Sequence, residues 1–208
     1  MRLFVGIALS DAVTRELSAL VARLRAKAEL GDGLRWTEPD SWHITLQFLG
    51  NTTPEQYACL MAQLGDVRSA PPLVELGKLG CFHPASVLFV DVAVTPGLAA
   101  LAERVVAATG RCGFAAEMRP FHPHITLARK TGNTGPREQG NKGAREQGSK
   151  NPRSESRNLR DLAAKAGACR FARFTAREFL LYESHLGTGR ARYEVRGRFQ
   201  LISQEGDA

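Results

Sequence analysis

The chain of 208 residues lacks long hydrophobic runs and has only four cysteines, at positions 59, 81, 112 and 169. Its apolar stretches are much shorter than the roughly 20 residues of a membrane-spanning helix, so no membrane span is expected. Because no two cysteines form a CxxC pair, a zinc site is not expected either. We predict buried free thiols in a reducing compartment, and hence a cytoplasmic protein. The short apolar start is better explained by a buried strand than by a signal peptide.

Positive charge is concentrated in the C-terminal part of the chain. The net charge is +7, yet residues 1–128 hold 11 Lys or Arg against 12 Asp or Glu. Residues 129–161 hold 9 against 4, and residues 170–198 hold 7 Arg against 3 Glu. Such a field attracts a polyanion, although charge alone does not identify a partner.

One tetrapeptide, His-Ile-Thr-Leu, occurs twice, at His43–Leu46 and at His124–Leu127. Each copy stands in an apolar, β-branched run that predicts a short strand. Because side chains alternate between the two faces of a strand, the histidine and threonine of each copy share one face. The isoleucine and leucine share the other face. The repeat therefore predicts two similar lobes that present two imidazoles to one cleft.

The remaining pattern predicts an α+β fold with two sheets in one bilobal domain over residues 1–208. We expect helices over 11–29, 54–64 and 96–109, with Thr53 as the cap of the second helix and Pro54 as its first residue. Strands are expected over residues 2–9, 42–49, 73–82, 86–94, 123–129, 173–185 and 190–201.

Two imidazoles across a cleft can divide acid and base catalysis between them. With an ordinary pKa of about 6.5, one histidine can take a proton from water while the other, protonated, gives a proton to a departing oxygen. The threonine beside each imidazole supplies a hydroxyl donor for the oxygens of a phosphate. The pattern predicts phosphodiester cleavage without a metal or a cofactor. The alternatives are purely structural histidines and a metal site built from His43, His122 and His124.

The chain resembles the two-histidine (2H) phosphoesterase superfamily. Within it, the chain is most similar to the bacterial and archaeal RNA 2',3'-cyclic phosphodiesterases, also called 2'-5' RNA ligases. The matching stretches are residues 2–7, 42–50, 119–129 and 179–184, so the resemblance covers nearly the whole chain except residues 131–157. The paired His-x-Thr signature is the most specific part of the match.

This resemblance implies a pseudo-twofold fold with two antiparallel sheets flanking a central cleft and helices outside. It also implies hydrolysis of the terminal 2',3'-cyclic phosphate of RNA to a 2'-phosphate. Carried over, His43 is the proton donor to the leaving 3'-oxygen, His124 is the proton acceptor that activates water, and Thr45 and Thr126 bind the phosphate. The expected partner is RNA with a 2',3'-cyclic phosphate end, acted on by a monomer away from membranes. The alternatives are 2'-5' RNA ligase activity and a non-catalytic protein that binds RNA ends.

Other residues near the motifs are weaker candidates. Arg129 is a possible phosphate or RNA contact, but strict alternation places it opposite His124, which favours a solvated cation. Phe48 can stack on a base, but a core position is favoured. For His122 two roles are open, shaping the cleft or capping a strand, and alternation does not decide whether Tyr182 reaches the cleft. His83 and His185 fall at turns.

Residues 131–157 interrupt the alternation of helices and strands. Apart from Ala144 they include no aliphatic or aromatic residue, and they carry the near-repeat Arg-Glu-Gln-Gly-Asn-Lys and Arg-Glu-Gln-Gly-Ser-Lys. Such a segment buries too little apolar surface to offset the entropy of ordering. We predict a disordered insertion in a surface loop, either a neutral expansion or a basic arm that holds RNA.

Overall fold

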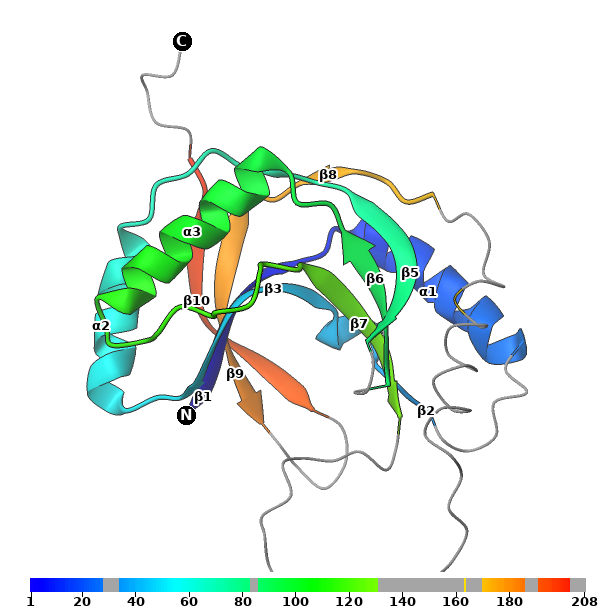
Figure 1. The fold of residues 1–208 in the computed structure, drawn as a ribbon, viewed down its shortest axis with the longest axis horizontal. Coiled ribbons are helices and arrows are strands. Elements are labelled where there is room, and N and C mark those ends of the chain that lie inside the picture. Colours follow the sequence, from blue (N-terminus) through cyan, green and yellow to red (C-terminus); the bar gives the residue numbers. More distant parts are fainter. Residues whose placement is uncertain (28–33, 83–85, 131–162, 164–169, 186–190, 203–208) are drawn as a thin grey trace, which may run out of the picture.

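The computed structural model describes residues 1–27, 34–82, 86–130, 163, 170–185 and 191–202 (Figure 1). The predicted insertion at residues 131–157 lies outside this part, as do His83 and Cys169. Within the described residues the chain forms two four-stranded sheets, a two-stranded sheet and three α-helices.

The two large sheets each contain one of the motif strands. The first sheet has the order β10 (Arg192–Gln200), β9 (Glu178–His185), β1 (Arg2–Ala8) and β3 (His43–Asn51). The second sheet has the order β2 (Leu34–Trp36), β7 (His124–Lys130), β6 (Val87–Val92) and β5 (Leu76–Phe82). β4 (Leu73–Val74) and β8 (Phe174–Thr175) form the small sheet. All these pairings are antiparallel. The predicted α+β fold with two antiparallel sheets is therefore confirmed.

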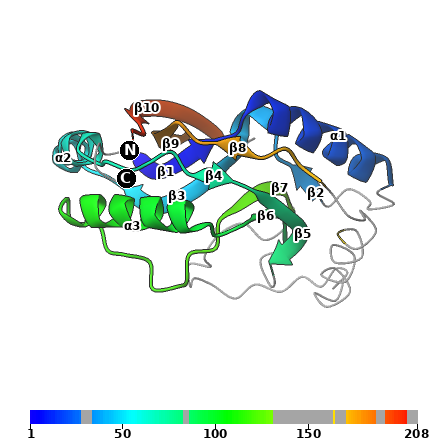
Figure 2. The same ribbon diagram turned by 90° about the horizontal axis from the view of Figure 1, so that it is seen from above.

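The helices are α1 (Asp11–Lys27), α2 (Pro54–Gly65) and α3 (Pro96–Gly110), with a short 3-10 helix, η1 (Pro39–Ser41), just before β3. In Figures 1 and 2, α2 and α3 lie side by side at one end of the molecule and α1 lies toward the other. One face of α1 is buried, at Val13, Leu17, Leu20, Val21 and Leu24. Each such side chain contributes about 1.5–3 kcal/mol on burial, and all five join one core with residues of both large sheets.

Local sequence signals account for the starts of the helices. The hydroxyl of Thr53 accepts from the backbone N–H of Gln56, and the Gln56 side chain accepts in return from the Thr53 N–H, at 3.2 and 3.1 Å. This reciprocal pair satisfies two of the backbone donors that a helix start leaves open. Pro54 follows as the first helical residue, so the predicted start of α2 is confirmed. Thr95 and Pro96 begin α3 in the same way, since the Thr95 hydroxyl accepts from Leu98 N–H at 3.3 Å.

Two of the predicted strands are each broken into two pieces. Residues 73–82 divide into β4 and β5, and residues 173–185 divide into β8 and β9. The first piece of each joins the small sheet, whereas the second piece joins a large one. Sequence periodicity cannot distinguish these cases, because the partner strands are distant in the chain. The prediction also missed β2 and η1, which are only three residues long.

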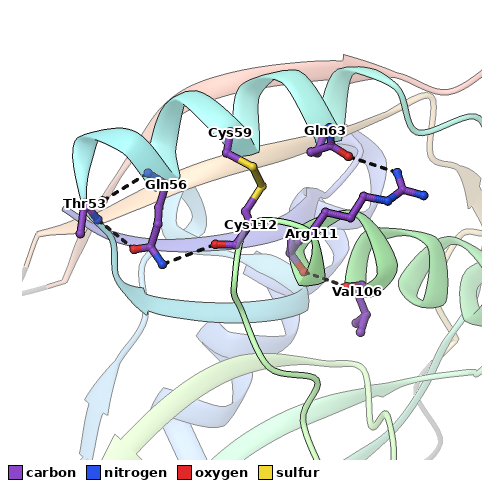
Figure 3. Close-up of a disulfide and its surroundings, with 8 residues drawn as sticks. Thr53, Gln56, Cys59, Gln63, Val106, Arg111 and Cys112 are labelled. Carbon is purple, nitrogen blue, oxygen red and sulfur yellow. Dashed lines mark hydrogen bonds between the residues drawn. A yellow bond between two sulfur atoms is a disulfide. The ribbon is translucent and has the colours of Figure 1, made fainter.

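A disulfide links α2 to the end of α3 (Figure 3). Cys59 and Cys112 are 53 residues apart in sequence, with their Cα atoms 5.8 Å apart. The prediction of free thiols is therefore wrong for these two cysteines, because the packing of two distant helices brings them together. The cytoplasmic location inferred from free thiols loses that support and stays a prediction. In the described part of the chain, no helix is long and apolar enough to span a membrane.

Candidate active site

The two motif strands have the same pattern of burial over seven residues. From His43 in β3 and from His124 in β7, successive side chains are half-buried, buried, half-buried, buried, buried, exposed and half-buried. Thr45 and Thr126 therefore share the partly open face with the histidines, as predicted. The isoleucine and leucine of each motif are buried in the core.

Each motif histidine is held through the same ring nitrogen by a carbonyl two residues earlier. Nδ1 of His43 donates to the Ser41 carbonyl at 2.9 Å, and Nδ1 of His124 donates to the His122 carbonyl at 2.9 Å. Because a carbonyl only accepts, Nδ1 carries the hydrogen in both rings, and Nε2 of a neutral ring keeps a lone pair. Both rings therefore present Nε2 for proton transfer.

Burial lowers the pKa of both motif histidines. The pKa of His43 falls to about 4, mainly through desolvation; the Ser41 carbonyl opposes the shift, and the charges of His124 and Arg129 add to it. The pKa of His124 is also lowered, mainly through desolvation. The hydrogen bond to the His122 carbonyl opposes this shift, and the charges of His122 and Arg129 add to it. Because Arg129 affects both rings and His124 affects His43, these three residues share one electrostatic environment. With His43 shifted this far, its imidazole is neutral at pH 7 in the free protein.

A β-bulge interrupts each motif strand at the same place. The extra residue is Leu46 in β3 and Leu127 in β7. Each is followed by a second buried residue, Gln47 or Ala128, so that two consecutive side chains point into the core. A bulge shifts the alternation of side chains by one residue. Beyond it, the odd and even positions of each strand exchange faces.

This exchange brings Phe48 and Arg129 onto the histidine face. Phe48 is 63% exposed, and its ring centroid lies 6.0 Å from that of Phe4, whose own centroid is 4.6 Å from that of His43. Arg129 is also exposed, and its charge adds to the effect of burial on both motif histidines. Two expectations are therefore wrong: Phe48 is not a core residue, and Arg129 does not lie on the face opposite His124. Strict alternation fails here because of the bulge, and the prediction missed it because nothing in the sequence signals a bulge.

A buried hydrogen bond from α3 stabilises the bulge of β3. The hydroxyl of Thr109 donates to the side-chain oxygen of Gln47 at 2.6 Å, and both side chains are buried. The Gln47 amide also donates to the Ala115 carbonyl at 3.4 Å. A buried amide with these partners keeps its hydrogen bonds on folding, which stabilises the bulged conformation.

Aromatic rings from β1, β9 and β10 surround His43. The Tyr193 ring meets the His43 ring edge-on with centroids 4.9 Å apart, and the Tyr182 ring lies 5.8 Å away. Tyr182 also stacks on Phe4 at 4.9 Å. Burial raises the pKa of Tyr182 to about 12 and also raises that of Tyr193, against the charge of Arg129. The open question about Tyr182 is thus resolved: it lies beside the histidine, and both phenols are neutral hydroxyls.

Around His124 the surroundings combine aromatic rings with a hydrogen bond between a second histidine and a carboxylate. The centroids of Phe82 on β5 and Phe89 on β6 lie 4.8 and 5.4 Å from that of His124. His122 lies 6.0 Å from the same ring, and its Nε2 is 2.8 Å from a carboxylate oxygen of Asp91. Asp91 is also the residue opposite His124 across β6 and β7. The carbonyl that holds His124 therefore belongs to a residue whose own ring is held by Asp91.

The alternative metal site, built from His122 and the two motif histidines, is not assembled. In the described part of the chain, three potential ligand atoms come within 4.8 Å of one another only at Glu183, His185 and Glu194. There Arg196 forms ion pairs with both glutamates, at 3.6 and 3.1 Å. One guanidinium group therefore already contacts both carboxylates of that group.

Several neighbours of the histidines were not indicated by the sequence. They are Phe4, Phe82, Phe89, Asp91 and Tyr193. Each stands in a predicted strand, but its position relative to a histidine depends on which strands pair. The only sequence signal for the four aromatic residues is a ring in a predicted strand, and no signal singles out Asp91.

Comparison with known proteins finds one matching family and several similar chains. The model of the 2'-5' RNA ligase superfamily matches residues 10–141. An RNA 2',3'-cyclic phosphodiesterase of Bacillus subtilis is 36% identical over 107 residues, which are 49% of this chain and 58% of that protein. An RNA 2',3'-cyclic phosphodiesterase of Aeropyrum pernix is 34% identical over 117 residues, which are 54% of this chain and 66% of that protein. The matched part is thus a little over half of the Bacillus relative.

Solved structures show the same fold over almost the whole chain. The structure of E. coli LigT in apo form has a TM-score of 0.68 and 25% sequence identity, and the likeness covers 97% of this chain and 98% of that one. A structure described as a phosphoesterase has a TM-score of 0.70 with 24% identity and the same coverage. Both large sheets and the matched histidine strands therefore belong to a known phosphoesterase fold.

Proposed function

Because the chain belongs to the 2'-5' RNA ligase superfamily, we propose that it hydrolyses the terminal 2',3'-cyclic phosphate of RNA to a 2'-phosphate. The observation that carries this proposal is the matched pair of histidines, each held through Nδ1 and each presenting Nε2. A threonine lies beside each of them on the same strand face. The relatives named RNA 2',3'-cyclic phosphodiesterase support the substrate class.

In the proposed reaction the two imidazoles act on opposite sides of the phosphorus. Nε2 of His124 takes a proton from the attacking water, whose oxygen forms the new bond to phosphorus. The bond from phosphorus to the 3'-oxygen breaks, and Nε2 of His43 gives its proton to that oxygen. The product is a 2'-phosphate and a free 3'-hydroxyl. Each proton transfer of this kind contributes about 10²–10⁴-fold to the rate, and none of these steps routes through a metal.

Protonation of His43 depends on the bound phosphate. Burial lowers its pKa to about 4 in the free protein, so the ring is neutral at pH 7. A phosphodiester anion beside the ring favours the charged imidazolium and raises that pKa. Substrate binding therefore favours the protonated form of His43, which is the form that can act as the proton donor.

Four side chains complete the proposed substrate site. Thr45 and Thr126 donate hydroxyl hydrogens to the phosphate oxygens, and Arg129 adds a positive charge on the same face. Phe48, exposed on the histidine face of β3, offers a flat surface on which the terminal base stacks. We also propose a monomeric, cytoplasmic enzyme that acts on RNA away from membranes. One copy suffices because both histidines come from one chain.

The first test is incubation with an oligoribonucleotide that ends in a 2',3'-cyclic phosphate, with EDTA present. We expect a 2'-phosphate product, identified by chromatography, from the wild type and from His185→Ala, the matched control at an exposed histidine of β9. His43→Ala and His124→Ala should each lose at least about 100-fold in kcat while keeping the wild-type circular dichroism spectrum. Turnover that EDTA abolishes, or that survives both substitutions, would contradict the proposal.

A substrate with a different leaving group distinguishes the proton donor from the proton acceptor. An aryl phosphodiester releases a phenolate that needs no proton, so the proton donor becomes dispensable while the acceptor does not. With such a substrate His43→Ala should recover most of the wild-type rate, and His124→Ala should not. Recovery in His124→Ala instead would exchange the two assignments. A 3'-phosphate product from RNA would move the leaving group to the 2'-oxygen.

Ligation across a 2'-5' bond is the second candidate function, favoured by the description of the matching family. The same two imidazoles serve ligation if the 5'-hydroxyl of a second RNA replaces water. His124 takes the proton of that hydroxyl, its oxygen forms the new bond to phosphorus, and the bond to the 3'-oxygen breaks as His43 gives its proton to that oxygen. Water at its ordinary concentration favours hydrolysis, so ligation should require a high concentration of RNA ends. Product analysis with a 5'-hydroxyl RNA added to the cyclic phosphate substrate measures the ratio of the two reactions.

A further inference from the structure

A hollow of about 210 Å³ lies between α2 and α3, on elements that carry neither motif histidine. Three arginines line it: Arg68 follows α2, Arg104 lies on α3, and Arg111 directly follows α3. Val67 and Ala108, both buried, contribute apolar surface. The hollow lies in residues 63–111, which hold four Lys or Arg against four Asp or Glu, so composition did not point to it.

Each of the three guanidinium groups is oriented by a neutral oxygen. Arg68 donates to the carbonyl of Gly65, Arg104 to the hydroxyl of Ser69 and Arg111 to the side chain of Gln63, at 2.8, 3.2 and 3.1 Å. In the described part of the chain, none of the three takes part in an ion pair within 4.0 Å. Asp66 is the acidic residue that lines the hollow, so positive charge is in excess there.

The two walls of the hollow are fixed to each other. The disulfide of Cys59 and Cys112 joins α2 to the end of α3, and Figure 3 shows Arg111 reaching across to Gln63 beside it. The Gln56 side chain also donates to the Cys112 carbonyl at 3.5 Å. The two walls of the hollow are therefore fixed relative to each other before any ligand arrives, which reduces the entropy lost on binding.

We infer that this hollow binds a phosphate group. Guanidinium groups present paired N–H donors that match the oxygens of a phosphate, and each of the three keeps donors beyond those used on its neutral partner. The apolar surface at Val67 and Ala108 suits the ester side of a phosphate rather than a free metal ion or a cationic ligand. The phosphate can belong to the backbone of a longer RNA or to a free nucleotide. Only the RNA source rests on the proposed function.

The test is a titration of isotope-labelled protein with inorganic phosphate, followed by amide chemical shifts. We expect shifts at residues 67–69 and 104–112 that are separate from those at the two histidine strands. The double variant Arg104→Gln/Arg111→Gln should weaken the binding at the hollow by about tenfold or more, and Arg104→Gln alone should weaken it less. The control Arg15→Gln/Arg23→Gln removes the same charge from exposed positions on α1 and should leave the hollow unchanged. Shifts confined to the histidine strands would overturn the inference.

Kinetics then identify the source of the phosphate. If it is the RNA backbone, the double variant should raise KM several-fold for a 20-nucleotide RNA with a cyclic phosphate end and leave a 2',3'-cyclic mononucleotide unaffected. If it is a free nucleotide, neither KM changes, and the shifts induced by a nucleoside monophosphate at the hollow are lost in the double variant. The titration needs no turnover, so a failure of the proposed function and a failure of this inference are seen separately.

Discussion

Phe48 and Arg129 occupy equivalent positions in the two motif strands. Each is the exposed residue that follows a bulge and a second buried side chain, and each lies on the face of its strand's histidine. The backbones of the two strands are thus alike, whereas the side chains differ in chemistry. One half of the site offers an aromatic surface and the other offers a cation. Under the proposed function, this difference gives a preferred orientation to a substrate that has a base on one side and a phosphate on the other.

The aromatic side of the site predicts a loss of base stacking in Phe48→Ala. Stacking of a base on an aromatic ring contributes about 1–3 kcal/mol, so KM for an RNA end should rise at least fivefold with kcat little changed. Phe48→Tyr, which keeps the ring, should remain near wild type. Initial-rate kinetics on a 2',3'-cyclic phosphate oligonucleotide measure both constants. An unchanged KM in Phe48→Ala would show that no base stacks there.

The cationic side predicts a change in histidine protonation in Arg129→Gln. The positive charge of Arg129 adds to desolvation in lowering the pKa of His43 and of His124, so its removal should raise both pKa values. An NMR titration of the imidazole Cε1–H signals in the free protein measures the change directly. Arg15→Gln, on α1, is the control and should leave both titrations in place. Lower pKa values in Arg129→Gln would contradict the shared environment of these three residues.

Burial of His43 predicts that the protein loses stability in mild acid. Its pKa is about 4 in the folded protein and ordinarily 6.5, so between these values the unfolded chain binds the proton and the folded protein does not. This contribution is complete above pH 6.5 and is lost as the pH falls toward 4, by up to about 3 kcal/mol. Urea unfolding between pH 7 and 4 measures it. The dependence should be smaller in His43→Gln; an equal slope in that variant would assign acid sensitivity to other groups.

The disulfide predicts that reducing agent destabilises the protein. Closing a loop with a sequence separation of 53 residues limits the unfolded chain and stabilises the folded one by about 2–4 kcal/mol. Thermal unfolding should therefore occur at a lower temperature with dithiothreitol, and the double variant Cys59→Ala/Cys112→Ala should show no such response. In denaturant, reduction should add two titratable thiols. No increase in thiol content would mean that these cysteines are not bonded.

The histidine–threonine pairs of the site could be predicted from the sequence because they depend on the order of neighbouring residues. Two copies of His-Ile-Thr-Leu place a histidine and a threonine on one face of a strand over a distance too short for tertiary contacts to alter. Helix starts were readable for the same reason, as Thr53 and Pro54 act on backbone groups within three residues. These interactions join neighbours in sequence, so one sequence is enough to predict them.

The sequence alone determined the fold class, the two motif strands and the histidine–threonine pairs of the site. Contacts between distant segments set what surrounds them: the bulges that turn Phe48 and Arg129 toward the histidines, the pairing of Cys59 with Cys112, and the hollow between α2 and α3 that three arginines line. A bulge depends on the register with a partner strand, and the other two features depend on the packing of distant helices. Residue alternation within one segment contains no information about either, because both are set by contacts between segments far apart in the chain.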